Sequence, residues 1–169
     1  ANGSVLNITN SEVSSNAQMG LQPYRQMSIT LDGVDFDQNG TDAIRIGGGS
    51  AEGSSIVATA CTFTNNSQGG FRAVRDGNYT FTNCEFTGNS QVGAKIDQVT
   101  NPTALTLDNC TLDNNGQQGV QLIGNSALID LDILNNSTVN SNGTAGTFSG
   151  IFVGSIADVA ISDTLINNS

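Results

Sequence analysis

The sequence predicts an all-β chain that winds into a parallel β-solenoid, and three observations lead to this fold class. A motif like that at residues 81–93 recurs along the whole chain, with successive copies 23–27 residues apart. Every copy carries an asparagine at the same position. Short stretches alternate apolar and polar residues with a period of two, the pattern of strands with one buried face. Self-similarity at this period is typical of solenoids, in which each repeat forms one coil.

The asparagine column is the most regular feature of the repeat. With Cys84 as the reference position of its copy, the equivalent anchors are Ser11, Val34, Cys61, Cys84, Cys110, Ser137 and Asp163. The asparagines five residues after them are Asn16, Asn39, Asn66, Asn89, Asn115, Asn142 and Asn168. In stacked coils equivalent residues lie above one another, and amides in such a column can hydrogen-bond from coil to coil. We therefore expect a structural asparagine ladder along the molecule.

Each copy predicts three short strands. In the copy around Cys84, residues 79–81 form the first strand, Phe86 faces inward on the second, and Ala94 and Ile96 face inward on the third. Sharp bends are expected before the anchors, at Asn10, Gly33, Ala60, Asn83, Asn109 and Asn136. Asn and Gly tolerate the left-handed backbone that a sharp bend needs, whereas Ala does not. The expected architecture is about seven coils of 23–27 residues with three short strands each, in a single domain spanning 1–169 that is either whole or part of a longer solenoid.

The run Asn-Cys-Glu-Phe-Thr-Gly-Asn at 83–89 and its copies resemble the repeats of the right-handed parallel β-helix family, which has the pectin-lyase-like fold. The Phe-x-x-Asn units at 36–39, 63–66 and 86–89, with the pair Gly69 and Gly70, also resemble repeats of polymorphic outer-membrane passenger domains. The resemblance covers nearly the whole chain and implies a right-handed coil. It implies no single activity, because the family holds lyases, hydrolases, epimerases, adhesins and phage tailspikes.

Composition narrows the function classes. The net charge of −10 argues against nucleic acid or an anionic membrane as a partner. No stretch approaches the roughly 20 apolar residues of a membrane span, so no membrane insertion is expected. The chain starts Ala-Asn-Gly-Ser without an initiator Met, which is typical of a processed, secreted or surface-displayed chain. Cys61, Cys84 and Cys110 share one column and are expected to be small buried apolar residues, with a disulfide between Cys61 and Cys84 as the alternative.

Few side chains suit catalysis, and the prediction leans away from an enzyme. The chain has no histidine, which excludes the usual serine and cysteine triads and a typical zinc site. The run Asp-Phe-Asp-Gln-Asn-Gly at 35–40 matches the start of a calcium loop. Its twelfth position is Ile46 rather than an acid, so Asp35 and Asp37 are a weak calcium site, or two solvated aspartates beside an inward Phe36. No other cofactor is indicated.

The five cations follow the repeat. Arg45, Arg72 and Lys95 each stand 11 residues after an anchor, outward on the third strand, and Gln121 continues that column. Arg25 and Arg75 stand 14 residues after theirs. In one interpretation Arg45, Arg72, Lys95, Gln121 and Arg75 line a shallow groove for an acidic or hydroxyl-rich glycan. The family resemblance adds a lyase variant in which Arg72 or Lys95 takes the proton beside a uronate. In the other interpretation Asp42, Asp76 and Asp97 neutralise these cations. The cationic side chains then extend into water, and the column binds no ligand.

The predicted function is mechanical: a secreted or cell-surface rod used in adhesion or end-to-end self-assembly. The full-length repeat and the absence of a capping helix or polar terminal repeat favour this reading. The expected partner is then a second copy of the chain, stacked on an open end of the solenoid. The alternatives are a polysaccharide-binding or polysaccharide-processing protein, and a segment of a phage or virus fibre.

Overall fold

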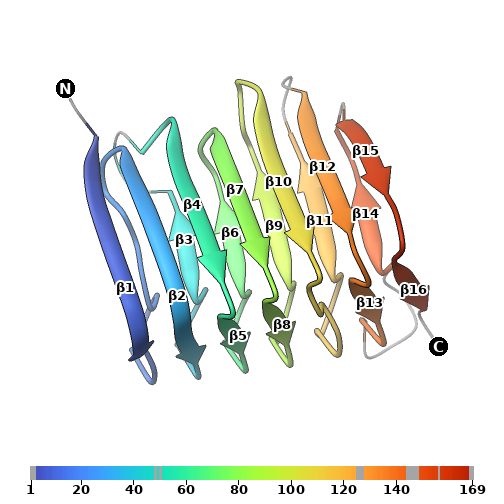
Figure 1. Cartoon of the computed structure of the whole chain (residues 1–169), viewed down its shortest axis with the longest axis horizontal. Coiled ribbons are helices and arrows are strands. Elements are labelled where there is room, and N and C mark those ends of the chain that lie inside the picture. Colours follow the sequence, from blue (N-terminus) through green and yellow to red (C-terminus); the bar gives the residue numbers. More distant parts are fainter. Residues whose placement is uncertain are drawn as a thin grey trace.

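The chain winds into a parallel β-solenoid whose coils follow one another along the long axis of the molecule (Figure 1). The computed structural model describes residues 3–47, 49, 51–124, 128–143, 149–155 and 157–167. Every strand pair is parallel and joins one coil to the next. The predicted all-β solenoid is therefore confirmed. No helix in the described part of the chain is long and apolar enough to cross a membrane.

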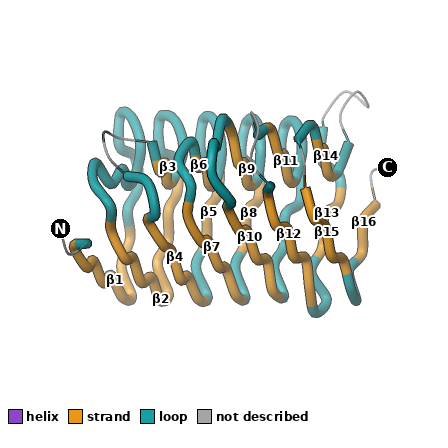
Figure 2. The backbone as a smooth tube through the Cα atoms, turned by 90° about the horizontal axis from the view of Figure 1, so that it is seen from above, coloured by secondary structure: helices purple, strands orange, loops and turns teal. Residues whose placement is uncertain are grey.

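The strands form three lines along the axis, seen as separate rows in Figures 1 and 2. The first line consists of β1 (Ser4–Glu12), β2 (Met27–Asp37), β4 (Ser54–Thr59), β7 (Gly77–Thr82), β10 (Thr103–Asp108), β12 (Ile129–Leu134) and β15 (Ala157–Ile161). The second consists of β5 (Thr62–Thr64), β8 (Glu85–Thr87), β13 (Thr138–Asn140) and β16 (Leu165–Asn167). The third consists of β3 (Ile44–Ile46), β6 (Phe71–Ala73), β9 (Ala94–Asp97), β11 (Val120–Ile123) and β14 (Ile151–Val153).

The coils differ in how their second strand forms. β1 and β2 run through the bend and supply both the first and the second strand of their coils. In the coil of Cys110 the second strand is reduced to single bridges, from Thr111 to Glu85 and to Thr138. The third-strand position occurs six times in the described residues. Five of these are the strands of the third line, and the sixth is Leu21, which bridges to Ile44 of β3 from the coil before it. The molecule thus has about six turns and the first two strands of another, rather than the seven coils expected.

The predicted bends are present. Asn10, Gly33, Ala60, Asn83, Asn109 and Asn136 have φ angles of 45°, 60°, 51°, 54°, 51° and 61°. These values lie in the left-handed region, which Gly and Asn tolerate best. The bend lets the first and second strands of one coil meet at an angle, so that both turn their apolar residues toward the axis.

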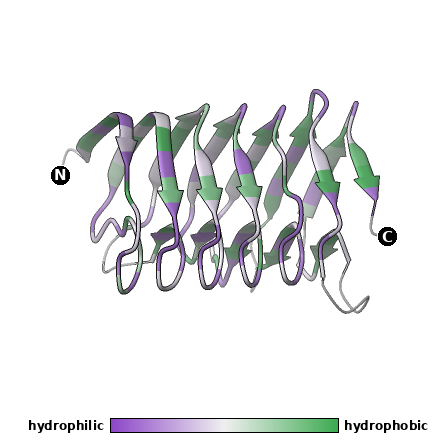
Figure 3. Cartoon of the chain, turned by 90° about the horizontal axis from the view of Figure 1, so that it is seen from below, coloured by the Kyte–Doolittle hydropathy of each residue, from purple (hydrophilic) through white to green (hydrophobic). Residues whose placement is uncertain are grey.

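The core consists of the inward columns of the three lines. Phe36, Phe63 and Phe86 stack coil on coil, with ring centroids 5.3 Å and 4.6 Å apart. Phe81 packs edge-on against Phe86, at 5.1 Å. All four side chains are fully buried. Figure 3 shows the outcome in the strands, where hydrophobic and hydrophilic segments alternate. Offset and edge-on ring pairs stabilise a fold beyond the burial of their apolar area, so this column is a major source of stability.

The cysteine column is buried and unpaired. Cys61, Cys84 and Cys110 are free thiols, each about 1% exposed, as the first of the two interpretations predicted. Each Sγ donates to the carbonyl oxygen two residues earlier, at 3.2–3.4 Å, across the bend. The adjacent Cys84 thiol and burial raise the pKa of Cys61, and the adjacent Cys110 thiol and burial raise the pKa of Cys84 to about 12. These two thiols therefore stay protonated at neutral pH.

The last coil departs from the predicted register by one residue. Val139 pairs with Ile166 and Thr138 with Leu165, so Thr164 rather than Asp163 stands in the anchor column. Thr164 Oγ1 donates to Ile133 O, as Ser137 Oγ does to Leu107 O one coil earlier. The physical reason is the bend, because Asp163 takes the left-handed φ of 48°. The sequence alignment had placed Asp163 in the anchor column, one residue after the position of a bend.

Candidate functional site

The asparagine ladder is the most fully hydrogen-bonded polar feature of the described chain. Asn66 shows the pattern. Its Nδ2 donates to Asn89 Oδ1 at 3.0 Å and to Phe36 O at 3.3 Å, and its backbone N–H also donates to Asn89 Oδ1. Its Oδ1 accepts from the backbone N–H and the Nδ2 of Asn39. Both amide hydrogens and both oxygen lone pairs are used, so this side chain is buried without an unmade hydrogen bond.

The same links run continuously from Asn16 to Asn142. The members are Asn16, Asn39, Asn66, Asn89, Asn115 and Asn142, and the Nδ2-to-Oδ1 distances between successive members are 2.8–3.0 Å. From Asn39 onward each is at most 2% exposed. The predicted ladder is confirmed over this range, and Asn168 lies outside the described residues. Its role is structural, because all of its polar atoms face other coils.

The cation column lies in one register on the outer face of the third line of strands. Arg45 pairs with Arg72, Arg72 with Lys95, and Lys95 with Gln121. Neighbouring strands are about 4.8 Å apart, so these cations stand close enough to repel one another. The predicted column is therefore present.

Asp97 neutralises the middle of this column. Its Oδ2 lies 2.6 Å from an Arg72 terminal nitrogen and 3.4 Å from Lys95 Nζ. Asp97 is only 5% exposed, and both cations are half-buried. Arg45, in contrast, has no ion pair within 4.0 Å in the described residues. The column therefore has a paired part, at Arg72 and Lys95, and an unpaired end at Arg45.

Asp42 is a second acid beside the column and is 1% exposed. Its Oδ1 accepts from the Gly69 backbone N–H at 3.1 Å, in space that Gly69 leaves by having no side chain. Its Oδ2 has no partner among the described residues. Burial raises the pKa of Asp42, and the charges of Arg72, Arg45 and Lys95 oppose that rise. Asp42 therefore sits close enough to offset the three cations electrostatically but makes no direct ion pair with them.

The remaining predicted residues have other partners. Arg75 Nε lies 3.1 Å from a carboxylate oxygen of Glu52, a loop residue that no repeat pattern pointed to. Asp76 does not join the cations and instead accepts a hydrogen bond from Asn101 Nδ2 at 2.8 Å. Gln121 Nε2 donates to Gln118 Oε1 at 3.3 Å. The neutralising interpretation thus holds at Asp97, holds electrostatically at Asp42, and fails at Asp76.

The proposed calcium residues border a shallow hollow of about 360 Å³ lined by Glu12, Asp35, Asp37, Thr62 and Thr64. Asp35 Oδ1 accepts from Thr62 Oγ1 at 2.8 Å, and Asp37 Oδ1 accepts from Thr64 Oγ1 at 2.9 Å. Asn39, the third ligand that the loop would require, is a member of the ladder. The described residues contain no group of three His, Cys, Asp or Glu placed to hold a metal ion. These carboxylates act as links between coils.

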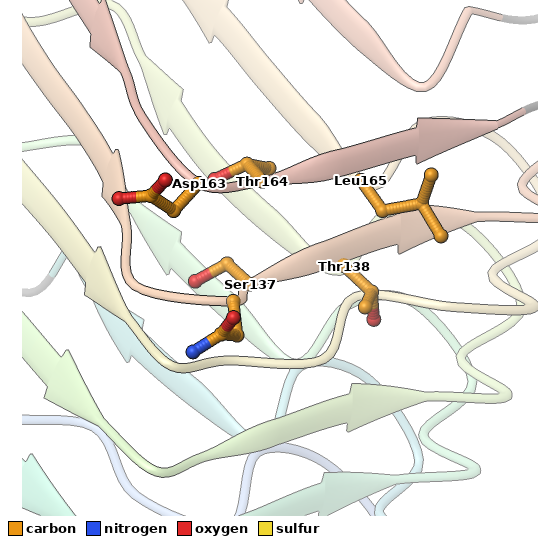
Figure 4. A pocket seen from close by; sticks show the side chains of 6 residues that line it. Ser137, Thr138, Asp163, Thr164 and Leu165 are labelled. Atoms are coloured by element: carbon orange, nitrogen blue, oxygen red, sulfur yellow. The ribbon is translucent and has the colours of Figure 1, made fainter.

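A second hollow, of about 510 Å³, lies beside the bends of the last two coils (Figure 4). It is lined by Asn136, Ser137, Thr138, Asp163, Thr164 and Leu165. Only Asp163 among these is ionisable, and the hydroxyls of Ser137 and Thr164 already donate to main-chain carbonyls. Leu165 is 58% exposed. The lining supplies no pair of groups for acid–base chemistry, since one carboxylate has no partner there.

Taken together, the parallel coils, the amide ladder and the partly neutralised outer column define a β-solenoid whose buried asparagines serve coil stacking. A family model described as "Right handed beta helix region" matches residues 1–168. The chain belongs to this right-handed β-helix family, as the resemblance had implied. Comparison with curated proteins and comparison with solved structures each found no match.

Proposed function

We propose that the protein is a structural rod, secreted or displayed at the cell surface, whose copies stack end to end and which serves in adhesion. The observation that carries this proposal is the pair of open ends of the described solenoid. Both ends present core positions that no coil of the described chain covers, and three of these positions at one end share a column with an exposed position at the other.

The amino-terminal end presents the inward residues of the first coil. Leu6, Ile8, Val13 and Leu21 are only partly buried, and they pack against the core from one side. The carboxyl-terminal end presents three of these columns, at Val159, Ile161 and Ile166, together with Val153 of the column of Ile46. Val153, Val159, Ile161 and Ile166 are 39–44% exposed, whereas their neighbours one coil inside are fully buried. Exposed, contiguous apolar surface of this kind typically marks an interaction site.

The columns make the two ends complementary. In a head-to-tail stack, Val159 would continue the column of Leu6, Ile161 that of Ile8, and Ile166 that of Val13. Each contact joins aliphatic side chains of similar size. The outer edges of β15 and β1 would pair in parallel, as every other first-line strand does. Open strand edges recruit further strands, so the geometry supports repeated axial addition of copies of the chain.

The test uses the 169-residue chain and two variants that place a charge in an end column. Ile8→Lys blocks the head and Ile161→Lys blocks the tail. Wild-type protein is expected to form filaments in electron micrographs. The particle size measured by light scattering should increase with protein concentration. Each variant alone should stay monomeric, and an equimolar mixture should stop at dimers, because one open head meets one open tail.

Val57→Lys is the matched control, since Val57 is 51% exposed on the outer face of β4. It should leave filament growth unchanged. A wild-type chain that stays monomeric at all concentrations, or end variants that assemble into filaments as well as wild type does, would contradict axial stacking. A phage or virus fibre would share this assembly, whereas adhesion predicts binding of the filaments to cells.

Glycan binding is a second candidate, favoured by the unpaired end of the cation column. Arg45 has no ion pair in the described residues, and the register sets it beside Gln22, two residues before Tyr24. Tyr24 is 71% exposed, and its ring lies against Gly49. A guanidinium without an ion pair, in register with a residue two positions from an exposed aromatic ring, suits an acidic sugar chain. Arg72, Lys95, Gln121 and Arg75 would then flank the subsite.

Polygalacturonate is the probe for this candidate. Arg45→Gln should weaken its binding by roughly 10- to 150-fold, since one charged hydrogen bond contributes roughly 1.5–3 kcal/mol. Arg25→Gln, an exposed cation outside the column, is the control. Equal binding by wild type and Arg45→Gln would exclude the subsite. Release of unsaturated uronate products, lost in Lys95→Gln or Arg72→Gln, would establish the lyase alternative.

A further inference from the structure

Three buried thiols stand one above another in the middle of the solenoid. Cys61, Cys84 and Cys110 come from three consecutive coils, and all three are free and about 1% exposed. Hydrogen bonds between coils place them in line. The backbone N–H of the residue after Cys84 donates to Cys61 O at 3.0 Å, and that of the residue after Cys110 donates to Cys84 O at 2.9 Å. The ladder and the cation column use none of these sulfur atoms.

The three side chains share one orientation. Each Sγ donates to the carbonyl oxygen two residues earlier in its own coil, at 3.2 Å for Cys61, 3.3 Å for Cys84 and 3.4 Å for Cys110. Side chains with the same orientation are separated by the distance between their coils, which is about 4.8 Å for neighbouring parallel strands. The sulfur atoms therefore form a line with two equal gaps, and Cys84 borders both.

This spacing suits a metal ion between two neighbouring sulfurs. The bond from a metal ion with a filled d shell to a thiolate sulfur is about 2.3 Å long, as for zinc, so two such bonds in line span about 4.6 Å. Thiolates select soft ions, and Cu(I), Ag(I) and Hg(II) form two collinear bonds to sulfur. Zinc takes four ligands. The described residues contain no group of three His, Cys, Asp or Glu that could hold a metal, so this column suits a two-coordinate ion and not zinc.

Binding is an exchange of protons for the metal. Two S–H bonds break, two metal–sulfur bonds form, and both protons leave to water. With Hg(II) the product carries no net charge, because the two thiolates cancel the charge of the ion. The three cysteines belong to the hydrophobic core, where an isolated charge is costly. A monovalent ion would leave one negative charge there and should bind less tightly than Hg(II).

Loss of the thiol protons leaves the carbonyls at the bends hydrogen-bonded. Thr82 O, which accepts from Cys84 Sγ, also accepts from a backbone N–H at 3.0 Å. Asp108 O, which accepts from Cys110 Sγ, also accepts from a backbone N–H at 2.9 Å. A buried acceptor left without a donor would oppose metal binding. These two carbonyls keep a donor when the metal replaces the protons.

We propose that the column of Cys61, Cys84 and Cys110 binds one soft metal ion between two neighbouring sulfurs, and that Hg(II) is the ion it holds most tightly. Cys84 is the ligand common to both possible pairs, so the native chain holds one ion as a neutral complex. The core around the sulfurs keeps water away from the ion. Uptake requires a coil to open, since the sulfurs have almost no exposed surface.

The test loads the intact 169-residue chain with mercuric chloride in an excess of glutathione. Glutathione removes ions held by a single sulfur, whereas two sulfurs fixed side by side compete well against separate thiols. Native mass spectrometry counts the bound ions. We expect one ion per chain and a Tm higher by several degrees, because the ion binds where the fold brings two sulfurs together. Zinc chloride should leave the chain without a bound ion.

Variants in the column separate the two pairs. Serine is compatible with this column, since Ser137 Oγ accepts from the Cys110 backbone N–H one coil beyond it. Cys84→Ser should bind no ion, because Cys61 and Cys110 are then two coils apart. Cys61→Ser is the matched control with the same loss of one thiol, and it should still bind one ion. Ser137→Cys should raise the count to two, because it completes a second pair with Cys110.

Circular dichroism checks that each variant is folded. Cys84→Val, which copies the buried Val34 of the same column, replaces Cys84→Ser if the serine variant unfolds. An ion retained by Cys84→Ser or Cys84→Val would overturn the proposal. So would a wild-type chain that binds no ion, either when loaded folded or when refolded from urea with the metal, or one whose Tm does not rise when the ion binds. Ions are counted per chain, so the outcome does not depend on end-to-end stacking.

Discussion

At the scale of single residues, the ladder explains why one residue type recurs without substitution. The position requires two donors toward two different coils and an oxygen that accepts twice. Asparagine alone offers this on a side chain short enough to stay inside the coil. Aspartate lacks the donors, and glutamine is one carbon longer. The Cys84 column has a weaker requirement, a small side chain: Cys84, Ser137 and Thr164 each donate to a carbonyl, whereas Val34 in the same column has no donor.

Asn89→Asp tests this requirement with almost no change of shape. The variant loses the donors to Phe63 O and Asn115 Oδ1 and buries a charge. We expect a loss of at least about 3 kcal/mol in the free energy of unfolding, measured by urea denaturation. Asn78→Asp, on the exposed outer face of β7, is the control and should change stability by less than about 0.5 kcal/mol. Similar losses in both variants would show that the ladder is not the cause.

Asp42 predicts a dependence of stability on pH. Burial raises its pKa in the folded state above the ordinary 3.8, so the folded protein binds that proton more tightly than the unfolded chain does. The cost of the buried charge is therefore present in full at neutral pH. It fades as the pH falls through the raised pKa and is gone below 3.8. Protonation of this carboxyl stabilises the fold.

Asp42→Asn should remove this cost while keeping the acceptor for the Gly69 N–H. We expect a higher Tm than wild type at pH 7 and a difference that shrinks toward pH 4, followed by thermal unfolding at several pH values. Asp130→Asn, at an exposed position of β12, corrects for the change in net charge. A lower Tm for Asp42→Asn at pH 7 would show that Arg45, Arg72 and Lys95 outweigh burial.

At the scale of the coil, two bends with left-handed backbone shape each turn. One precedes the anchor and includes Ala60, at a φ of 51°. The other directly precedes the ladder and consists of Ser15, Gln38, Asn65, Gly88, Asn114 and Ser141, with φ angles of 48–66°. Left-handed backbone costs an alanine about 1 kcal/mol more than it costs glycine or asparagine. Ala60 is therefore a stored local strain.

Replacing that residue should stabilise the protein. In the following coils Asn109 Nδ2 donates to Asn83 Oδ1 at 2.7 Å. An asparagine at position 60 would supply an equivalent Oδ1, to which Asn83 Nδ2 could donate. We expect Ala60→Asn to gain roughly 1 kcal/mol in urea denaturation. Ala60→Val, which adds a β-branch at the same φ, should lose stability instead. An Ala60→Asn variant no more stable than wild type would mean that the surrounding coils already relieve the strain.

The repeat made most of the coil predictable, because register in a solenoid follows directly from sequence period. The asparagine column, the inward columns, the first bend and the alignment of Arg45 with Arg72 all came from spacing alone. The pairing of Asp97 with Arg72 and Lys95 had been one of two interpretations of the column, and the sequence did not decide between them. Contacts from segments outside the period could not be predicted, and Glu52 reaches Arg75 from such a loop. The second bend was missed because its column mixes Ser, Gln, Asn and Gly.

The shift at Asp163 has a different cause. The alignment fixed the last copy on the final asparagine, whereas the fold fixes it on the bend. A residue that tolerates left-handed backbone determined the register there, and a single-residue offset moves side chains to the other face of a strand. Aligning the copies on the asparagine column alone is therefore least reliable in the last copy, where fewer neighbouring coils constrain the strand pairing.

At the scale of the whole molecule, each coil touches only its two neighbours, so stability approaches a sum of coil and interface contributions along one axis. The burial of an inward residue likewise depends on its two neighbouring coils. The strands of central coils bury every inward residue, whereas β15 and β16 bury none. In Figure 3 the strand nearest the carboxyl end is coloured largely as hydrophobic, although its residues are exposed. The free energy of unfolding lost when an inward side chain is truncated should therefore depend more on the coil in which it lies than on its residue type.

Ile133 and Ile161 test this dependence, because the two isoleucines are register partners in one column. Ile133 is fully buried and Ile161 is 44% exposed. Ile133→Ala should cost about 2–5 kcal/mol through lost burial and the cavity left behind, and Ile161→Ala less than about 1 kcal/mol, in urea denaturation of dilute protein. If copies stack end to end, the cost of Ile161→Ala should rise with protein concentration, since a covered isoleucine regains its burial. Equal costs at all concentrations would show that Ile161 is packed as tightly as the centre, and the end of the described solenoid would then not be open.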